Sequence, residues 1–142
     1  MPQQLLSPEI QAFATGFPIT LLHASLTVLI LLLGSGLYVM LTPHREIALI
    51  REGNTAAALS LAGVMLGLAL PLGVSLHVST SLAEIGVWGV STVIVQLLVF
   101  RIVDLILRGL PQRIQEGEMA AATVLVGTKL ATAVILASAV AG

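Results

Sequence analysis

Four long apolar runs dominate the pattern of hydrophobic and polar positions along this 142-residue chain. A helix that crosses a bilayer needs roughly 20 consecutive apolar residues. The runs do not alternate polar with apolar residues, so they do not fit the strands of a membrane barrel, whereas helices satisfy their own backbone groups in lipid. The pattern therefore predicts an all-α membrane protein with four transmembrane helices, at residues 19–41, 55–76, 85–107 and 119–140.

An internal repeat with an offset of 64 residues runs from the polar loops into the second and fourth apolar runs. Residues 50–63 read IREGNTAAALSLAG and residues 114–127 read IQEGEMAAATVLVG, with eight of fourteen positions identical. We interpret the chain as two tandem helical hairpins, residues 19–76 and 83–142. Because each hairpin has an even number of spans, it ends on the side where it began. The two copies are therefore predicted to be parallel, unlike the inverted repeats of many transporters.

Basic residues gather on one side of the predicted topology. They lie in or beside the two loops within the hairpins, whereas residues 77–83 and both termini contain no lysine or arginine. The positive-inside rule then predicts that both hairpin loops are cytoplasmic and that both termini, including the segment 1–18, are outside. The residues that decide this orientation are Arg45, Arg51, Arg101, Arg108 and Arg113.

Composition supports a location in the bilayer and removes several function classes. The chain is 57% hydrophobic and 9% charged, whereas soluble domains carry about 25% charged residues. Its net charge of -1 gives no basic surface for nucleic acid. It contains no cysteine, which removes disulfides, thiolate metal sites and cysteine nucleophiles. No hydrolase, kinase, dinucleotide or metalloprotease motif occurs, so we expect no enzyme, no catalytic residue, no metal site and no cofactor.

The least expected residue is Lys129, near the centre of the fourth predicted span. A charge at that depth costs at least roughly 2.5–3.5 kcal/mol, so it is expected to face the bundle interior or water. The third span offers Gln96 at a similar depth, and Asp104 lies about 12 Å further toward the cytoplasmic end. Lys129 is either a structural lysine that snorkels toward the interface or part of a polar pathway. Asp104 also shares a helix face with Arg101 and Arg108, which predicts ion pairing within that helix. The alternative for this group is recognition of an anionic headgroup or ligand.

Glu52 and Glu116 occupy the same position in the two repeat copies, each directly before a glycine. In a structural role, the glycine permits a sharp turn and the acidic group complements the dipole of the following helix. In a functional role, the two glutamates form an acidic ring at the cytoplasmic mouth of an oligomer, where carboxylates attract cations. The sequence leaves both roles open.

Small residues also recur at one position of the repeat. Gly63 and Gly67 form a GxxxG motif in the second span, and Gly127 and Ala131 form the corresponding pair in the fourth. Such faces allow helices to approach closely. We therefore expect the second and fourth helices to pack along these faces, within one subunit or between subunits.

Residues 48–63, ALIREGNTAAALSLAG, resemble the domain-of-unknown-function 350 family, whose members are small bacterial inner-membrane proteins built from a duplicated two-span unit. The later segment QEGEMAAATVLVG is similar to the second copy of that unit. The resemblance covers nearly the whole chain and implies a four-span protein of the bacterial inner membrane without an assigned role. No catalytic residue carries over from the family. The two copies differ where Glu118 replaces Asn54 and where Lys129 stands in a span.

Two functions fit these observations. The first is a homo-oligomeric small pore or transporter-like protein for an ion or small solute, based on the parallel repeat, the paired glutamates and Lys129. The alternative is a non-transporting membrane scaffold or a stress-associated protein that binds a partner, based on the small-residue faces and the lack of a continuous polar stripe. The lipid bilayer is the expected surrounding in both.

Overall fold

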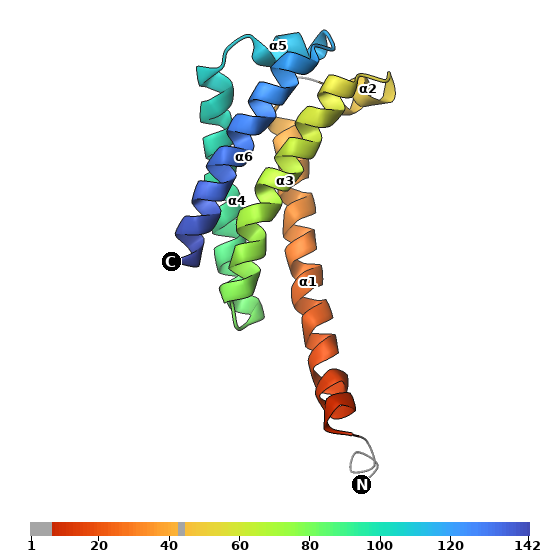
Figure 1. Cartoon of the computed structure of the whole chain (residues 1–142), viewed down its shortest axis with the longest axis vertical. Coiled ribbons are helices and arrows are strands. Elements are labelled where there is room, and N and C mark those ends of the chain that lie inside the picture. The colour runs from red at the N-terminus through yellow and green to blue at the C-terminus, as the bar shows by residue number, and fades with distance from the viewer. Residues whose placement is uncertain (1–6, 43–44) are drawn as a thin grey trace.

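The computed structural model describes residues 7–42 and 45–142, and all regular structure in these residues is helical. Four helices are long and apolar enough to cross a membrane: α1 (Pro8–Leu41), α3 (Thr55–Val78), α4 (Leu82–Ile106) and α6 (Met119–Ala141). Two short helices, α2 (Glu46–Arg51) and α5 (Leu110–Gln115), lie together at one end of the bundle (Figure 1). The predicted all-α membrane fold with four spans is confirmed.

The first helix starts earlier than the sequence pattern predicted. Helix α1 begins at Pro8, where a proline in the first turn loses no hydrogen bond, and it continues through Pro18. Figure 1 shows that its first half extends beyond the other helices. From residue 8 onward, the predicted N-terminal segment 1–18 is therefore part of helix α1. Residues 1–6 lie outside the described residues.

Helix α3 is the centre of the bundle, since it packs against α1, α4 and α6. Glycines permit this close packing. A methyl group added at Gly63 would lie 2.6 Å from Val126 Cγ2 of α6, and one added at Gly67 would lie 2.6 Å from Phe100 Cζ of α4. The prediction that small residues of the second span form a packing face is therefore correct for the α3 half.

The matching prediction for the fourth span is wrong within one chain. Gly127 and Ala131 are exposed, and a methyl group added at Gly127 would meet no atom within 4 Å. Helix α6 instead packs through another face. Its buried residues recur nearly every fourth position and therefore lie along one side of the helix. These are Ala121, Ala122, Leu125, Lys129, Ala133 and Ala137.

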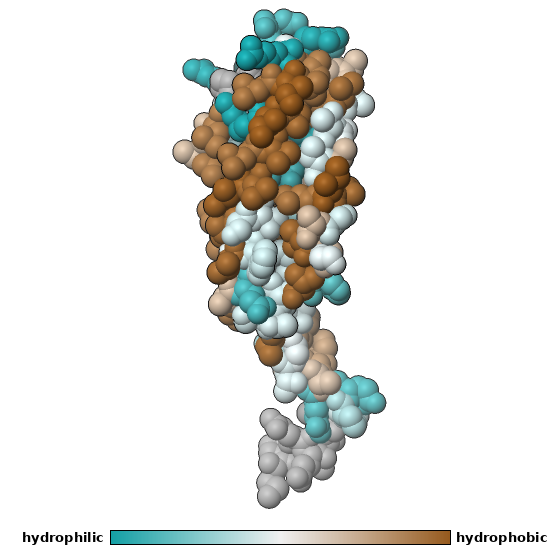
Figure 2. All heavy atoms as spheres, turned by 90° about the vertical axis from the view of Figure 1, so that its left-hand side faces the viewer, coloured by the Kyte–Doolittle hydropathy of each residue, from teal (hydrophilic) through white to brown (hydrophobic). Residues whose placement is uncertain are grey.

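Two apolar clusters fill the interior. The first occupies the half of the bundle away from the short helices and includes Leu68, Leu72 and Leu97. The second lies near the short helices and includes Ala57, Ile114 and Leu125. The outer surface is also largely apolar along the middle of the bundle, with hydrophilic colours at the end that carries the short helices and again toward the opposite end (Figure 2). A surface of this kind suits contact with lipid rather than water.

Candidate functional site

Lys129 lies inside the bundle, with only 1% of its surface exposed. It is ten residues from the start of α6, which places its backbone about 15 Å along the helix. Its side chain lies on the face that α6 buries against the other helices, so it is surrounded by protein rather than lipid. A lysine at this depth requires a charged or polar partner.

Two other spans supply those partners. The Lys129 Nζ lies 2.8 Å from Asp104 Oδ1 of α4 and donates a hydrogen bond of 2.6 Å to Tyr38 Oη of α1. It also lies 4.7 Å from the centroid of the Tyr38 ring and 5.4 Å from that of Phe100. The lysine therefore connects α1, α4 and α6 through charge-assisted contacts in a low-dielectric interior.

This geometry corrects the expected pairing of Asp104. We predicted pairing with Arg101 and Arg108 on the same helix, but Asp104 pairs with Lys129 of α6. Within the residues that the structure describes, neither arginine forms a salt bridge. The lysine side chain is flexible enough to reach toward Asp104, and the protonated lysine gains more from a buried carboxylate than an interfacial arginine would.

Gln96 lies deeper in the bundle than Asp104 and is fully buried. Its Nε2 donates to Thr132 Oγ1 at 3.4 Å, and its Oε1 has no hydrogen-bond partner among the described residues. Gln96 and Lys129 thus face the same α4–α6 interface, since Thr132 is on α6. No direct contact joins the two, so Gln96 extends the polar interior rather than pairing with the lysine.

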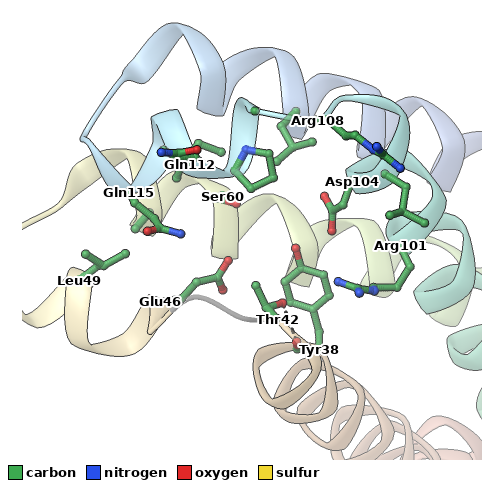
Figure 3. A pocket seen from close by; sticks show the side chains of 16 residues that line it. Tyr38, Thr42, Glu46, Leu49, Ser60, Arg101, Asp104, Arg108, Gln112 and Gln115 are labelled. Atoms are coloured by element: carbon green, nitrogen blue, oxygen red, sulfur yellow. Dashed lines mark hydrogen bonds between the residues drawn. The ribbon is translucent and has the colours of Figure 1, made fainter.

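A cavity of about 330 Å³ lies beside Asp104 and Tyr38, at the end of the bundle that carries the short helices. Figure 3 shows the Glu46 carboxylate and the Arg101 guanidinium pointing into it from opposite sides, with Asp104 and Tyr38 between them. The remaining polar wall comes from helices α3 and α5 and from residues that closely follow the ends of α1 and α4. It consists of Thr42, Ser60, Arg108, Gln112 and Gln115.

Glu46 is the most unusual group in this cavity. It begins helix α2, is 4% exposed, and its Oε2 has no hydrogen-bond partner in the described part of the chain. Burial raises the pKa of the Glu46 carboxyl to about 7, a rise that Asp104 reinforces and Lys129 opposes. Near neutral pH the carboxyl therefore exists in both protonation states.

Glu52 and Glu116 do not join this cluster. Both are exposed at the C-terminal ends of α2 and α5, and neither lines the cavity. The glycines that follow them, Gly53 and Gly117, adopt φ values of +88° and +83°, which suit glycine and let each short helix end sharply. The structure thus gives these positions a turn in the backbone and places their carboxylates in solvent.

The residues after those glycines differ in chemistry. The Asn54 side chain accepts a hydrogen bond from Ala57 N at 3.0 Å and caps helix α3. It also donates to the carbonyl oxygens of Ile114 and Gln115, which ties α3 to α5. Glu118 instead forms an exposed ion pair with Arg113. The two turns share a backbone shape, but only Asn54 crosses from one hairpin to the other.

Sequence reasoning missed Tyr38 and Glu46. Tyr38 is the only tyrosine of the chain and stands near the end of a span in which no charged residue occurs after Glu9. Glu46 follows that span and lies outside the repeated segment, residues 50–63. An isolated phenol at the end of an apolar run was the one signal available, because no spacing rule connects either residue with Lys129.

A family model described as Domain of Unknown Function (DUF350) matches residues 12–140. The UPF0719 inner membrane protein YjfL of Escherichia coli strain K12 is 36% identical over 85 residues, and YjfL of strain O157:H7 gives the same values. The match covers 60% of this chain and 64% of the relative, so it spans slightly less than two thirds of that protein. No solved structure matches the chain. The chain belongs to the DUF350 family and is a multi-pass membrane protein.

Proposed function

We propose that this DUF350 member forms a homo-oligomeric pore or transporter-like protein for an ion or small solute. The observation that carries the proposal is the buried group of Lys129, Asp104 and Tyr38, which lies within the spans beside a polar cavity. Charged groups inside a bilayer are expensive and commonly mark ion or substrate pathways. A scaffold could pack four apolar helices without them.

The cavity and the far core divide the bundle into a polar half and an apolar half. On one side the cavity reaches Asp104, and on the other Leu68, Leu72 and Leu97 fill the interior. Passage of a solute therefore requires the far core to open. We take the described conformation as one in which the site faces the short-helix end only.

Association of several copies would supply further helices to enclose a pathway, since one chain has only four spans. Gly127 and Ala131 occupy the repeat positions of Gly63 and Gly67, yet they are exposed. Gly63 receives Val126 of α6, so the free face at Gly127 is suited to a helix of another copy. This contact is the basis for proposing a homo-oligomer.

The proposed orientation places the cavity on the cytoplasmic side. Arg45 and Arg51 lie in the first hairpin loop, and Arg108 and Arg113 lie in the second, at the end that carries α2 and α5. By the positive-inside rule this end is cytoplasmic, with both termini outside. We propose no enzymatic activity, since the charged groups face a cavity inside the helical bundle and the loops are short.

A flux assay in liposomes tests the transport role. The purified chain is reconstituted in parallel with the double variant Lys129→Met, Asp104→Asn, which removes both charges and leaves no unpaired ion. Arg51→Gln, an exposed change outside the cavity, serves as the matched control. Movement of protons, monovalent ions or small organic anions is followed by entrapped dyes and isotopes.

We expect flux with the unchanged chain and with Arg51→Gln, and at least a tenfold loss with the folded double variant, on the order expected for removing a charged site. Absence of flux for every ion and solute would overturn the proposal. Equal flux from the double variant would remove the buried group from the pathway.

The alternative is a non-transporting scaffold or a stress-associated protein that binds a partner. The apolar core around Leu68 and Leu72 favours it, because that core closes half of the bundle. The exposed Gly127 face would then receive a helix of another protein. Crosslinking in membranes through a cysteine at Ala131 separates the two: a covalent dimer of this chain alone supports the homo-oligomer, and a hetero-adduct supports the scaffold.

A further inference from the structure

Two ionisable groups face the cavity without a partner among the residues that the structure describes. The Arg101 guanidinium points toward the centre of the cavity, and among the described residues it forms neither a salt bridge nor a hydrogen bond (Figure 3). The Glu46 carboxyl approaches from the opposite wall, and its Oε2 is buried without a hydrogen bond. Groups of this kind usually meet a ligand or a bound water, because an unsatisfied buried polar atom is costly.

The charges around the cavity do not balance. Arg101 and Arg108 line the cavity and Lys129 lies behind Asp104, which makes three positive charges, whereas Asp104 and Glu46 contribute at most two negative charges. Asp104 is already paired with Lys129, so the excess falls on the arginine side. Protonation of Glu46 would raise that excess by one further charge. An anion is therefore the ligand class that the electrostatics favour.

We propose that the cavity binds an anion, a carboxylate or a sulfate- or phosphate-type group, between the Arg101 guanidinium and a protonated Glu46 that donates a hydrogen bond to it. The inference rests on the proposed function, for which it names the class of solute. Arginine suits both oxyanion types, because its planar fork of N–H groups matches their oxygens. A protonated carboxyl supplies the donor on the opposite wall.

Anion binding is thereby linked to proton uptake. The titratable or charged groups around Glu46 are Tyr38 of α1, Arg101 and Asp104 of α4, Arg108 in the turn after α4, and Lys129 of α6. Among the described lining residues, α3 and α5 add only neutral polar groups. Because a bound anion repels the ionised carboxylate, it favours the protonated form of Glu46. The affinity for an anion therefore rises as the pH falls through neutrality.

The same chemistry is available from two sources. The cavity borders Leu105, which lines it and is 55% exposed, and the neighbouring Ile106 is 73% exposed. A lipid could place its headgroup in the cavity and its chains along this apolar surface. A free anion could enter from the short-helix end. Both place an oxyanion against Arg101, and binding experiments with and without lipid distinguish them.

The test measures anion affinity of the full chain in a neutral maltoside detergent. Acetate and sulfate are the free probes, because neither titrates between pH 6 and 8, and calorimetric titration is carried out at constant ionic strength. Phosphatidylglycerol is the lipid probe, read as a rise in thermal stability in nanodiscs compared with phosphatidylcholine alone. The variants are Arg101→Gln, Glu46→Gln and the control Arg51→Gln.

We expect one of the free probes or the lipid to bind about tenfold more tightly at pH 6 than at pH 8. Arg101→Gln should weaken binding at least about tenfold, in line with loss of a charged contact. Glu46→Gln should bind equally at both pH values, because its amide donates a hydrogen bond without titrating. Arg51→Gln should behave as the unchanged chain.

Three results would overturn the inference: no binding of any probe, the same affinity with Arg101→Gln, or tighter binding at pH 8. The last would mean that a proton on Glu46 does not assist the binding of an anion. Glu46→Gln keeps the size of the side chain, so its loss of pH dependence is informative even if Arg101→Gln folds poorly. Binding in detergent without flux in liposomes would leave this inference intact and reject transport, and flux without anion binding would do the reverse.

Discussion

Helices α3 and α6 have related sequences at an offset of 64 residues, yet they bury different faces. In α3 the glycines Gly63 and Gly67 lie against neighbouring helices, whereas in α6 the corresponding Gly127 and Ala131 are exposed. In the apolar 18-residue stretch of each helix, 44% of the residues are buried in α3 and 22% in α6. Similar sequence therefore did not lead to similar packing.

The position of each helix in the bundle explains the difference. Helix α3 is surrounded by α1, α4 and α6, so small residues are useful on several of its faces. Helix α6 lies at the edge and packs mainly on α3, so one face suffices. That single face carries Lys129. The buried charge is therefore on the edge helix rather than on the central one.

The candidate site consists of positions at which the two halves of the chain differ. Five of its ionisable members have an apolar residue 64 positions away, whereas Arg108 corresponds to His44. The pairs, with the site residue first, are Glu46 and Leu110, Lys129 and Met65, Asp104 and Met40, Arg101 and Leu37, and Tyr38 and Ile102. The matching parts build the hairpins, and the differing parts meet in a single asymmetric site.

The largest expected effect comes from replacing Lys129 of α6 with methionine, the residue at the corresponding position of α3. Lys129→Met removes the cation and leaves Asp104 without its partner, so we expect a loss of about 3–5 kcal/mol in the free energy of unfolding. Adding Asp104→Asn should recover most of that loss. Reversible unfolding in mixed micelles with SDS measures both. A loss below about 1 kcal/mol in the single variant would mean that the ion pair contributes little.

The next effect concerns Glu46, whose counterpart is Leu110. Because its pKa is raised to about 7, the folded chain holds this proton more tightly than the unfolded chain does. The resulting stabilisation is complete below the ordinary pKa and is lost as the pH rises through about 7. Its upper limit is about 3 kcal/mol.

Unfolding measured from pH 5 to pH 8 should show this decline in the unchanged chain and a flatter profile in Glu46→Gln. Arg51→Gln provides the control for changes at the same end of the bundle. Identical profiles for the unchanged chain and Glu46→Gln would rule out Glu46 as the source of the pH dependence.

A smaller effect compares the two small-residue faces directly. Gly63→Ala should destabilise the chain by about 1–3 kcal/mol, because the added methyl group would overlap Val126. Gly127→Ala should be neutral or stabilise by up to about 1 kcal/mol, since the site is open and alanine favours helix. Equal losses in both variants, measured by SDS unfolding, would show that a partner helix covers Gly127 in the micelle.

The smallest effect compares the residues after the two turns. Asn54→Ala removes a helix cap and two hydrogen bonds to α5, for a loss of about 1–2 kcal/mol. Glu118→Ala removes only an exposed ion pair, for a loss between about 0 and 1 kcal/mol. Thermal unfolding of the two variants side by side checks the order, and the reverse order would mean that the Arg113 pair holds the second turn.

The four apolar runs were sufficient to predict the membrane fold. The length and apolar character of the four runs demanded helices, because lipid offers no partner for backbone groups, and the Glu-Gly turns marked where α3 and α6 begin. The sequence also singled out Lys129, since a charge within a span has few explanations. These conclusions depend on local composition and spacing, which one chain displays directly.

The contacts of Lys129 and the packing of the glycines depend instead on how the helices are arranged in space. The pairing of Lys129 with Asp104 and Tyr38 joins residues of three helices, and no sequence period specifies how far one helix slides or turns against another. Gly127 matches Gly63 in sequence but lies on an edge helix. Glu46 became part of the site only because α2 folds back over the ends of the spans, which buries a carboxyl that the sequence places in a polar loop.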